Sequence, residues 1–443
     1  MNKKDFPEGK IIFEIESLGP MRESIINFRP FLLFSGESNT GKSYTAMAVY
    51  YLFYMLDNEK IISELTPKLF NIKKIENELK SKKEIQVDFP KKLPGELEKL
   101  YNNNISRFMA YILGYDEFSC KVVLKLNIPL DTNCKIHISL NKKKNGNQFL
   151  AIEGNSVGVI SNITSSDKIK KLEDALNNWF YSSLNRIVFG KDIIRKFLLP
   201  PARGAFSGLT PSMWKHFSGI GMYNEFLEGI DSVRFSDFDI PEQLEVQKKL
   251  INPLFEKLLQ GKIMIERDKA SYTISSSNKK IPLSAGSSSV KELFPLYLLL
   301  NRVLIDEISV CIEEPEAHLH PELQRSTALL LSYIINHGGF VQATTHSDFF
   351  VNQVNNLLKL HFLKNKEHHR FLTALKETGV QREFVLDHHD LGAYYFEKNK
   401  DGVHARKLEV SEKGIPLESF KHAYEQSVEE TRNLREALIE DAE

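Results

Sequence analysis

The chain has 443 residues, of which 42% are hydrophobic, 10% aromatic and 26% charged. This length and composition exclude a small disulfide-stapled fold and a disordered or fibrous protein, and they predict two or three globular domains. Lys plus Arg and Asp plus Glu both number 58, so the net charge gives the whole protein no attraction for nucleic acid or an anionic membrane.

The sequence contains no visible targeting or membrane segment. Residues 1–10 are charged and lack the apolar core of a signal peptide. The longest apolar run, residues 293–305, contains Asn301 and Arg302 and is too short to span a bilayer. The three cysteines have no C-x-x-C spacing, and their odd number indicates a reducing compartment. We therefore expect a cytoplasmic protein without a membrane partner.

The first predicted elements are a strand, a loop and a helix. Apolar runs at residues 11–15 and 31–34 are typical of strands, and the turn residues Ser35 and Gly36 end the second run. A nearly continuous apolar pattern of helical type begins at Lys42. The chain is thus expected to pass from a buried strand to a buried helix through one short loop.

The middle of the chain predicts an inserted arm followed by antiparallel strands. Residues 57–118 are Lys-rich and mostly helical in pattern, with prolines at the breaks. Residues 136–141 and 149–152 have the period-two pattern of strands and flank an Asn-Gly turn, which predicts an antiparallel ribbon. Helical periodicity returns at residues 168–195 and 241–260.

The second half of the chain predicts a parallel sheet. One strand is expected at residues 262–274 and a helix at residues 284–304. A short buried strand at residues 310–312, a helix from Pro321 and a strand at residues 340–344 follow. This order of strand, helix and strand is typical of parallel neighbours.

A phosphate-binding loop is predicted between the first helix and the strand that precedes it. Residues 36–43 fit the pattern G-x-x-x-x-G-K-[ST] in the structural setting that the pattern needs. The N–H groups of such a loop and the positive end of the helix surround phosphates. Lys42 would reach the β- and γ-phosphates, and the Ser43 hydroxyl would bind Mg²⁺. The expected nucleotide contacts are Gly36, Glu37, Ser38, Asn39, Thr40, Gly41, Lys42, Ser43 and Tyr44.

Two adjacent carboxylates, Glu313 and Glu314, follow the buried strand at residues 310–312. This placement is unfavourable unless a cation or a proton offsets the charge. A nucleotide-bound Mg²⁺ would do so, with Glu313 supporting the metal and Glu314 orienting or deprotonating the attacking water. The alternative is a solvated acidic turn that starts the next helix.

Two polar turns complete the candidate site. His346 follows the strand at residues 340–344, and its imidazole can donate a hydrogen bond to a γ-phosphate oxygen. Residues 283–289 are Ser-rich and precede a helix, where hydroxyl and N–H groups form an anion site. Since the first loop already holds one side of the triphosphate, this second site is expected to serve the nucleotide of another subunit. Its candidate contacts are Ser284, Gly286, Ser287 and Ser288.

These four pieces, in this order, resemble the ATP-binding-cassette (ABC) ATPase heads of the SMC-like group. The run Glu-Glu-Pro-Glu-Ala-His-Leu-His-Pro at residues 313–321 is similar to that of the overcoming-lysogenization-defect (OLD) family. The resemblance covers about residues 10–56 and 260–350, with weaker likeness at residues 198–203. It implies an α/β fold, an ABC-type ATPase head whose P-loop core sheet carries an antiparallel β subdomain and an inserted helical lobe.

The resemblance also implies a set of roles. They are Walker A at residues 36–43, Walker B at Glu313, a catalytic set of Glu314, His346 and Lys42, a D-loop at residues 317–320, and Mg²⁺ ligands at Ser43 and Glu313. ATP and Mg²⁺ are the implied cofactors. A homodimer or a higher even-numbered homo-oligomer closing around ATP is the implied assembly.

Several departures from the family pattern matter. The signature can be aligned at residues 283–286 or at the Ser287-Ser288 pair, and Ser289 stands where glycine is usual. No Q-loop glutamine is assigned. The stretch after His346 is too short to hold the Toprim nuclease domain of full-length OLD proteins beside the rest of the head, so a Toprim-less relative is expected.

The predicted segments follow from these assignments. They are 1–56, ATPase core with Walker A; 57–118, Lys-rich helical arm; 119–204, antiparallel β subdomain and return to the core; 205–260, helical lobe; 261–392, ATPase core with signature, Walker B, D-loop and switch His; and 393–443, C-terminal strand and acidic helix.

Two other segments contain residues that could bind a metal ion or a phosphate backbone. Residues 387–390, Asp-His-His-Asp, contain metal ligands, but the strand pattern at residues 391–396 favours a polar turn. The lysines of residues 57–118 are interleaved with Glu76 and Glu78, which leaves nucleic-acid contact open. Residues 417–443 have the pattern of an acidic surface or partner-docking helix.

The favoured function is an ATP-binding and ATP-hydrolysing switch that dimerises around Mg-ATP and controls a partner effector. Relatives without the nuclease domain often belong to bacterial anti-phage systems and are encoded beside a toxin or nuclease, so the resemblance implies an effector of that kind. The alternative is an SMC-type ATPase that binds duplex DNA in processing or repair. A metal nuclease at residues 387–390 ranks last.

Overall fold

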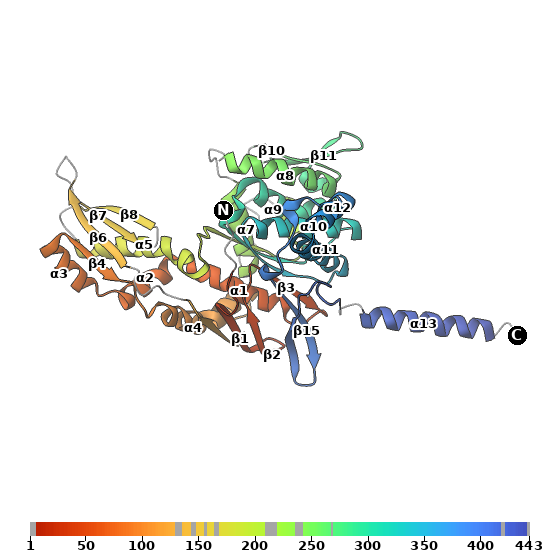
Figure 1. Cartoon of the computed structure of the whole chain (residues 1–443), viewed down its shortest axis with the longest axis horizontal. Helices are drawn as coiled ribbons and strands as arrows, with labels where there is room; N and C mark the ends of the chain where they lie inside the picture. The colour runs from red at the N-terminus through yellow and green to blue at the C-terminus, as the bar shows by residue number, and fades with distance from the viewer. Residues whose placement is uncertain are drawn as a thin grey trace.

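The computed structural model places a head at the centre of the molecule, a lobe on one side and a C-terminal helix on the other (Figure 1). The ranges it describes are residues 6–128, 135–142, 148–154, 157–163, 168–208, 219–234, 242–266, 269–417 and 421–440. The mixed α/β class expected from the sequence is confirmed.

The head is built on a nine-stranded sheet with the order β5-β1-β2-β16-β15-β3-β14-β13-β9. Its strands are β1 (Ile11–Leu18), β2 (Met21–Asn27), β3 (Phe31–Gly36), β5 (Cys120–Leu126), β9 (Arg195–Leu199), β13 (Ile308–Glu313), β14 (Phe340–Thr344), β15 (Leu391–Asn399) and β16 (Gly402–Leu408). From β15 to β9 every neighbouring pair is parallel, whereas β5, β1 and β2 pair antiparallel. The predicted parallel arrangement of the strands at residues 310–312 and 340–344 is confirmed.

Helices cover both faces of the parallel strands, because these strands are apolar on both sides. Leu32 and Phe34 pack in one core cluster with α1 (Lys42–Leu56). Phe31 and Leu33 pack in the other cluster, which contains residues of α9 (Ser288–Arg302), α10 (Pro321–Asn336) and α11 (Asp348–Lys366). The period of two along β3 thus fixes the strand between two helical layers.

The first cluster contains a group of stacked phenylalanines around Phe53. The ring of Phe53 lies parallel to that of Phe189, with centroids 4.6 Å apart and an interplanar angle of 8°. It also lies 5.7 Å from Phe340 and 5.9 Å from Phe28. This group joins α1 and β14 to α5 (Lys168–Phe189).

Replacing Phe53 by Leu is expected to lower the free energy of unfolding by about 1–2 kcal/mol, because it keeps most of the buried volume but removes the ring stacking. Urea denaturation followed by circular dichroism measures the change. The matched control is Tyr115→Leu at a side chain that is 53% exposed, where a change within about 0.5 kcal/mol is expected. Equal stability of Phe53→Leu and wild type would contradict the packing described.

The lobe combines helices with a second, antiparallel sheet of order β4-β6-β7-β8. Its elements are α2 (Glu59–Leu69), α3 (Ile72–Lys82), β4 (Glu84–Asp88), β6 (Lys135–Lys142), β7 (Gln148–Gly154), β8 (Val157–Ile163) and α5. The predicted ribbon is confirmed as β6 and β7. The Lys-rich segment is mostly helical as predicted, but it also contains β4, which the sequence analysis missed. The apolar Ile85 and Val87 alternate with polar neighbours over only five residues, too few to stand out among helical patterns.

The helix α4 (Leu93–Leu113) returns from the lobe to the head. The Tyr101 hydroxyl donates a hydrogen bond to the Ala48 carbonyl of α1 at 2.7 Å. Asn102 Oδ1 accepts from the Leu124 N–H of β5 at 2.8 Å. The first contact joins α4 to the helix that begins at Lys42, and the second joins α4 to β5 of the head sheet.

The remaining elements belong to the head and to the C-terminal part of the chain. They are α7 (Gly221–Arg234), α8 (Glu242–Leu259), β10 (Gly261–Glu266), β11 (Lys269–Ile274), β12 (Lys280–Pro282), α12 (His368–Thr378), α13 (Lys421–Glu440) and the 3₁₀ turns η1 (Arg203–Gly208), η3 (Leu283–Ala285), η4 (Ile305–Glu307), η5 (Arg382–Phe384) and η6 (His388–Asp390). The helices expected at residues 168–195, 241–260, 284–304 and from Pro321 are present. The first ends earlier than predicted, at Phe189, and Arg195 already begins β9. The third is shorter than predicted, since α9 spans Ser288–Arg302.

Two expectations about strands need correction. The single strand predicted at residues 262–274 is wrong, because β10 and β11 pair antiparallel as a hairpin. The charged residues 266–269 carried the signal for that break. The expected division of the chain at residue 392 falls inside β15, which is an interior strand of the head sheet next to β3.

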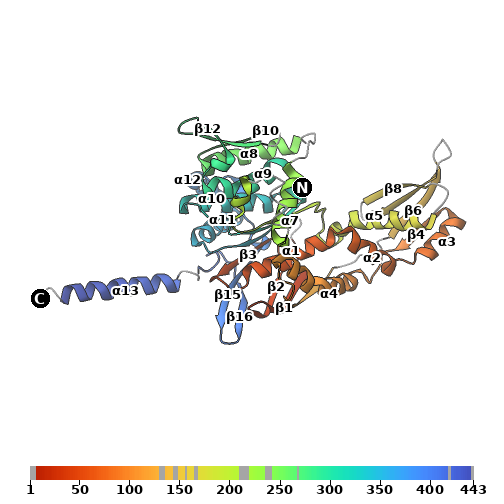
Figure 2. The ribbon, with the colours of Figure 1, turned by 180° about the vertical axis from the view of Figure 1, so that it is seen from behind.

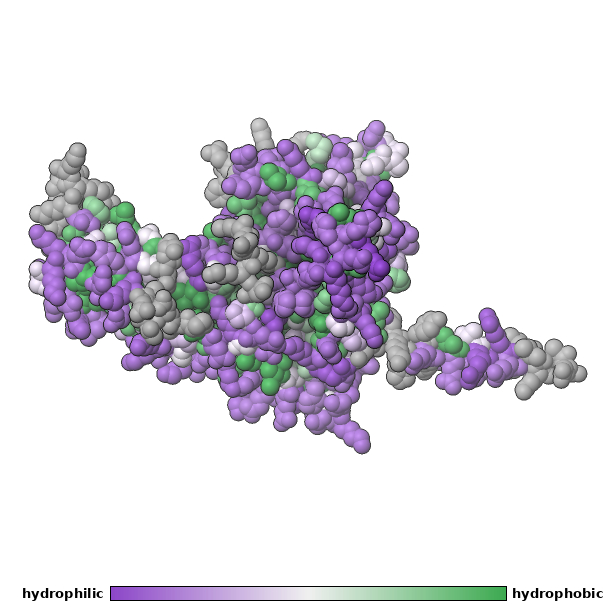
Figure 3. All heavy atoms as spheres, in the orientation of Figure 1, coloured by the Kyte–Doolittle hydropathy of each residue, from purple (hydrophilic) through white to green (hydrophobic). Residues whose placement is uncertain are grey.

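The surface of the head and lobe is mostly hydrophilic in the view of Figure 3. Figure 2 shows the helix α13 projecting away from the head on the side opposite the lobe. Within the described ranges, no helix has both the length and the apolar character that crossing a bilayer requires.

Candidate functional site

The loop between β3 and α1 has the backbone of a phosphate-binding loop. The strand ends at Gly36 and the helix begins at Lys42, as the sequence predicts. Gly36 and Gly41 have φ values of 131° and 88°, which side chains rarely adopt. A Cβ atom on Gly36 would lie 2.7 Å from the Phe396 carbonyl oxygen of β15. Glycine is therefore required where the loop leaves the sheet.

The Lys42 side chain folds back into this loop and is buried. Its ammonium donates to the Gly36 carbonyl at 3.0 Å and to Thr40 Oγ1 at 3.3 Å, and it also contacts the Glu37 carbonyl. Burial lowers the pKa of Lys42 to about 8, and the carboxylates of Glu314 and Glu313 act in the opposite direction. The lysine thus lies close to both acidic residues that follow β13.

Ser43 and Glu313 meet across the edge of the sheet. The Ser43 hydroxyl donates a hydrogen bond to Glu313 Oε2, whereas Glu313 Oε1 is buried without a hydrogen-bond partner. Burial raises the pKa of Glu313 to about 7, against the opposing effect of the Ser43 hydrogen bond. An unpartnered buried carboxylate oxygen beside a hydroxyl is a donor set that suits a hard cation. The residues present therefore fit Mg²⁺.

Glu314 occupies the turn directly after β13. Its φ of 44° is in the left-handed region, and its N–H donates to the Thr344 carbonyl of β14 at 3.1 Å. Burial lowers the pKa of Lys42 and of His346, and the Glu314 carboxylate is near enough to both groups to oppose this lowering. The left-handed turn places this acid among the candidate catalytic residues rather than in a solvated helix start.

His346 lies in a turn that a buried carboxylate holds in place. Glu316 Oε1 accepts a hydrogen bond from Thr345 Oγ1 at 2.6 Å and from the His346 N–H at 2.9 Å. The pKa of His346 is lowered by burial and by the Lys42 charge, against the opposing effects of Glu314 and the Gly36 backbone. Sequence analysis gave Glu316 no separate role, although it belongs to the residue 313–321 run.

Arg203 is a site residue that sequence analysis missed. Its side chain is 1% exposed and contacts the backbone just beyond the ends of β9 and β13. Nη1 donates to the Glu313 carbonyl at 2.7 Å and to the Pro200 carbonyl at 3.2 Å, and Nη2 donates to the Glu314 carbonyl at 3.4 Å. The residue belongs to the segment of weaker family likeness at residues 198–203, and this likeness was the only sequence feature that pointed to it.

The same arginine connects the acidic turn to α9. Its Nε donates to the Glu292 carbonyl at 3.1 Å and lies 3.6 Å from Glu292 Oε2. The other carboxylate oxygen of Glu292 accepts from the Gly204 N–H at 3.0 Å. Arg203 therefore holds the backbone of both candidate acids against the helix that follows the Ser-rich segment.

The Ser-rich segment is mostly exposed and makes its described hydrogen bonds within its own turn and to His318. The side chains of Ser284, Ser287 and Ser288 are exposed, and Ser287 caps α9 by accepting from the Val290 N–H at 3.4 Å. Gly286 is buried, and Ser289 Oγ donates to the His318 carbonyl at 3.1 Å. Within the part of the chain that the structure describes, no hydrogen bond joins the exposed serines to residues 36–44. The structure brings together Lys42, Ser43, Glu313, Glu314 and His346, but not the serines.

The comparisons with known proteins are consistent with a nucleotide site. Residues 223–351 match the model of the AAA ATPase domain, a stretch that contains α9, β13 and β14. This match supports the predicted ATPase core over these residues. No curated protein matches the chain. The OLD-like grouping and the lack of a Toprim domain stay predictions.

Solved SMC heads are similar to this chain at low sequence identity. The SMC head domain from Thermotoga maritima has 10% identity and a TM-score of 0.31, over 91% of this chain and 100% of that chain. The SMC head bound to the C-terminal winged-helix domain of ScpA has 11% identity and a TM-score of 0.38, over 92% and 98%. The SMC head with an extended coiled coil, bound to the C-terminal domain of ScpA derived from Pyrococcus furiosus, has 11% identity and a TM-score of 0.35, over 96% and 99%.

Proposed function

We propose that this protein binds and hydrolyses Mg-ATP at the edge of the sheet where β3, β14 and β13 end. The observation that carries the proposal is the Ser43 hydroxyl bonded to the buried Glu313, whose second oxygen has no partner. Ligands of open α/β sheets bind outside the carboxyl ends of the strands, and these three strands are neighbours in the order β3-β14-β13. A bound cation would satisfy the free oxygen of Glu313.

The residues of this edge have distinct roles in the proposed reaction. Lys42 exchanges the loop carbonyls for the β- and γ-phosphates, and the loop N–H groups hold the phosphates. Ser43 and Glu313 would hold Mg²⁺, which would neutralise charge at the phosphates. Glu314 orients or deprotonates the attacking water, and the His346 imidazole donates to a γ-phosphate oxygen.

We further propose that two heads close on two nucleotides. The support is the exposure of Ser284, Ser287 and Ser288 around the start of α9, together with the lack of any described hydrogen bond from them to residues 36–44. Hydroxyl and N–H groups at a helix N-terminus suit an anion. A second subunit would bring its nucleotide to these groups, so the assembly is a homodimer or a higher even-numbered homo-oligomer.

The output of the switch is proposed from the resemblance to OLD-like ATPases. Nucleotide-driven closure would control a separately encoded effector, a toxin or nuclease, in bacterial anti-phage defence. The second candidate is a DNA-processing ATPase, which the lysines of the lobe favour. Ion pairs such as Lys80–Glu76, at 2.6 Å, reduce the positive charge available to a phosphate backbone, so we place it second. Capture of the effector with tagged protein supports the first candidate, and salt-sensitive retention of duplex DNA supports the second.

Native mass measured by light scattering tests the closure. Glu314→Gln is expected to shift from monomer to dimer, or to a higher even-numbered assembly, when Mg-ATP is added, because it keeps the nucleotide while hydrolysis is blocked. The double variant Lys42→Ala, Glu314→Gln is the matched control and should not shift. A Glu314→Gln protein that binds ATP but stays a monomer would contradict the two-head proposal.

A further inference from the structure

A second polar cluster lies at the opposite end of the parallel strands from the 36–43 loop. It comprises His361 on α11 and Asp387 and His388 at the start of η6, and we call it the His361 cluster. The strand β15 begins directly after η6, and its first residue, Leu391, pairs with Phe31 at the start of β3. At the end of β3, Gly36 pairs with Phe396. At a rise of about 3.3 Å per residue, the length of β3 separates this cluster from the nucleotide edge.

Three potential metal ligands converge in the His361 cluster. One nitrogen of each imidazole and one carboxylate oxygen all lie within 4.8 Å of one another. His361 Nε2 is 3.5 Å from Asp387 Oδ1, and His388 Nδ1 is 3.4 Å from the same oxygen. His361 is 9% exposed, and the other two residues are half-buried. The cluster thus joins a buried helix position to a turn that is distant in the sequence.

One of these ligand atoms lacks a hydrogen-bond partner. His388 Nδ1 is buried and makes no hydrogen bond, which is unusual for a polar atom in a native fold. His361 Nε2 lies 2.9 Å from the Asn365 side-chain nitrogen. Asn365 is exposed, so its amide can turn to water if the imidazole binds a cation instead. His388 Nδ1 can therefore offer its lone pair to a cation, and His361 Nε2 can exchange the Asn365 amide for one.

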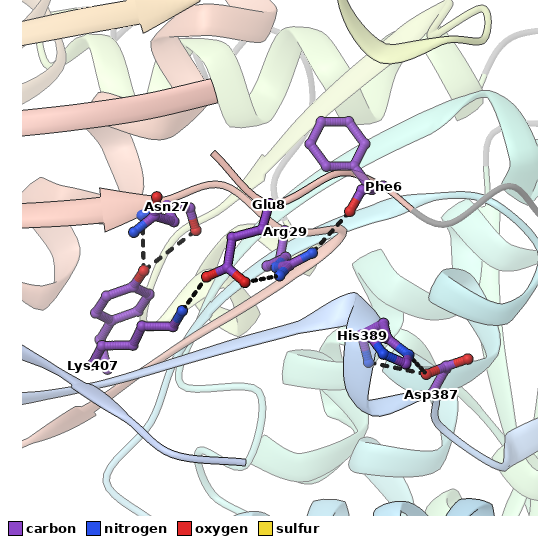
Figure 4. A network of polar contacts seen from close by, with 8 residues as sticks. Phe6, Glu8, Asn27, Arg29, Asp387, His389 and Lys407 are labelled. Atoms are coloured by element: carbon purple, nitrogen blue, oxygen red, sulfur yellow. Dashed lines mark hydrogen bonds and ion pairs between the residues drawn. The ribbon is translucent and has the colours of Figure 1, made fainter. Parts of the chain in front are cut away.

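The carboxylate of the cluster is oriented from its outer side. Asp387 Oδ1 accepts the His389 N–H at 2.9 Å and lies 3.1 Å from His389 Nδ1, a pair drawn in Figure 4. Hydrogen bonds to a carboxylate from groups that do not bind the metal fix the orientation in which it binds the ion. The nearby Arg29 is paired with Glu8 at 2.7 Å, which offsets the cation that would otherwise oppose a metal ion (Figure 4).

We propose that His361, Asp387 and His388 bind one divalent first-row transition-metal ion, for which Zn²⁺ is the probe. The two imidazoles are borderline ligands that suit Zn²⁺ rather than Mg²⁺, the carboxylate is also a known zinc ligand, and water completes a four-coordinate site. The ion would link α11 to η6 and so fix the start of β15 against α11. Binding is independent of ATP, and no hydrolysis is assigned to the site, unlike the nuclease considered for residues 387–390.

Calorimetric titration of the metal-free full-length protein with Zn²⁺, without nucleotide, tests the proposal. Wild type is expected to bind one equivalent of Zn²⁺. His388→Ala and His361→Gln should each weaken binding at least about tenfold, since losing a residue that only orients a metal ligand already lowers the affinity by about that much. The matched control is His404→Ala, because His404 forms an isolated pair with Asp401 at 3.3 Å and should leave Zn²⁺ binding unchanged.

Thermal denaturation separates loss of the site from loss of the fold. Wild type and His388→Ala should melt together without metal, and only wild type should gain melting temperature as Zn²⁺ is added. Co²⁺ should give the visible absorption bands of a tetrahedral site in wild type alone. Failure of wild type to bind one equivalent of Zn²⁺, or equal binding by a folded His388→Ala, would overturn the proposal.

Discussion

Glu314→Gln is expected to reduce ATP turnover by about 100-fold or more while ATP binding is retained. The amide keeps the size of the side chain but can no longer accept a proton from water, and a positioned general base contributes about 10²–10⁴-fold. The left-handed turn of Glu314 and its N–H bond to the Thr344 carbonyl do not depend on the side-chain charge, so the backbone should be preserved. Single-turnover phosphate release and nucleotide binding measure the two effects.

The matched control for this substitution is Glu322→Gln. Glu322 lies in the first turn of α10, shortly after the acidic run, and none of the described contacts joins it to the loop at residues 36–43. Its variant should hydrolyse ATP at the wild-type rate. A Glu314→Gln protein with wild-type turnover would remove the proposed base from the mechanism.

Arg203→Met is expected to lower the free energy of unfolding by about 3–5 kcal/mol, because it leaves Glu292 as a buried charge without its partner. The methionine fills the space of the arginine stem, so the loss of stability measures the contribution of the guanidinium group. The carbonyls of Glu313 and Glu314 also lose their donor. Urea denaturation measures the stability, and turnover should fall even at temperatures where the variant is folded.

Two further variants test whether the loss of stability comes from the unpaired buried charge of Glu292. Arg186→Met removes an arginine that pairs with Asp192 but is 32% exposed in its side chain, and a loss within about 1 kcal/mol is expected. Adding Glu292→Gln to Arg203→Met should recover part of the stability, since the unpaired charge is gone, but not the turnover. Equal stability of the single and double variants would contradict the pairing of Arg203 with Glu292.

The candidate site could be predicted as far as its residues are close in sequence. The loop at residues 36–43 and the run at residues 313–321 are contiguous patterns whose chemistry is local. Ser43 and Glu313 meet because β3 and β13 both pair in parallel with β14, which lies between them. The strand-helix-strand order indicated the pairing of β13 with β14, whereas the place of β3 beside β14 could not be predicted from it.

Arg203 could not be predicted in the same way. A lone arginine after two prolines has no local pattern, and its partners Glu292 and Glu313 are 89 and 110 residues away in sequence. Its position depends on β9 pairing with β13 at the edge of the sheet. Long-range pairing of this kind is set by packing, which periodicity does not report.

The same distinction between local patterns and long-range pairing applies to the fold. The apolar runs of β3, β13 and β14 were visible because buried parallel strands are apolar on both faces. The place of β15 beside β3 was not, because the two strands are separated by most of the chain. The His361 cluster was half visible, since His388 belongs to a conspicuous run whereas His361 lies inside a helix.

The central claim is that the residues around Lys42 and Glu313 form a Mg-ATP hydrolysis site. Steady-state phosphate release, measured for wild type with Mg²⁺, with EDTA and for Lys42→Ala, tests it most directly. The account predicts turnover that EDTA abolishes, that Mg²⁺ restores and that Lys42→Ala reduces by about 100-fold or more. Turnover that persists in EDTA or in Lys42→Ala would contradict it.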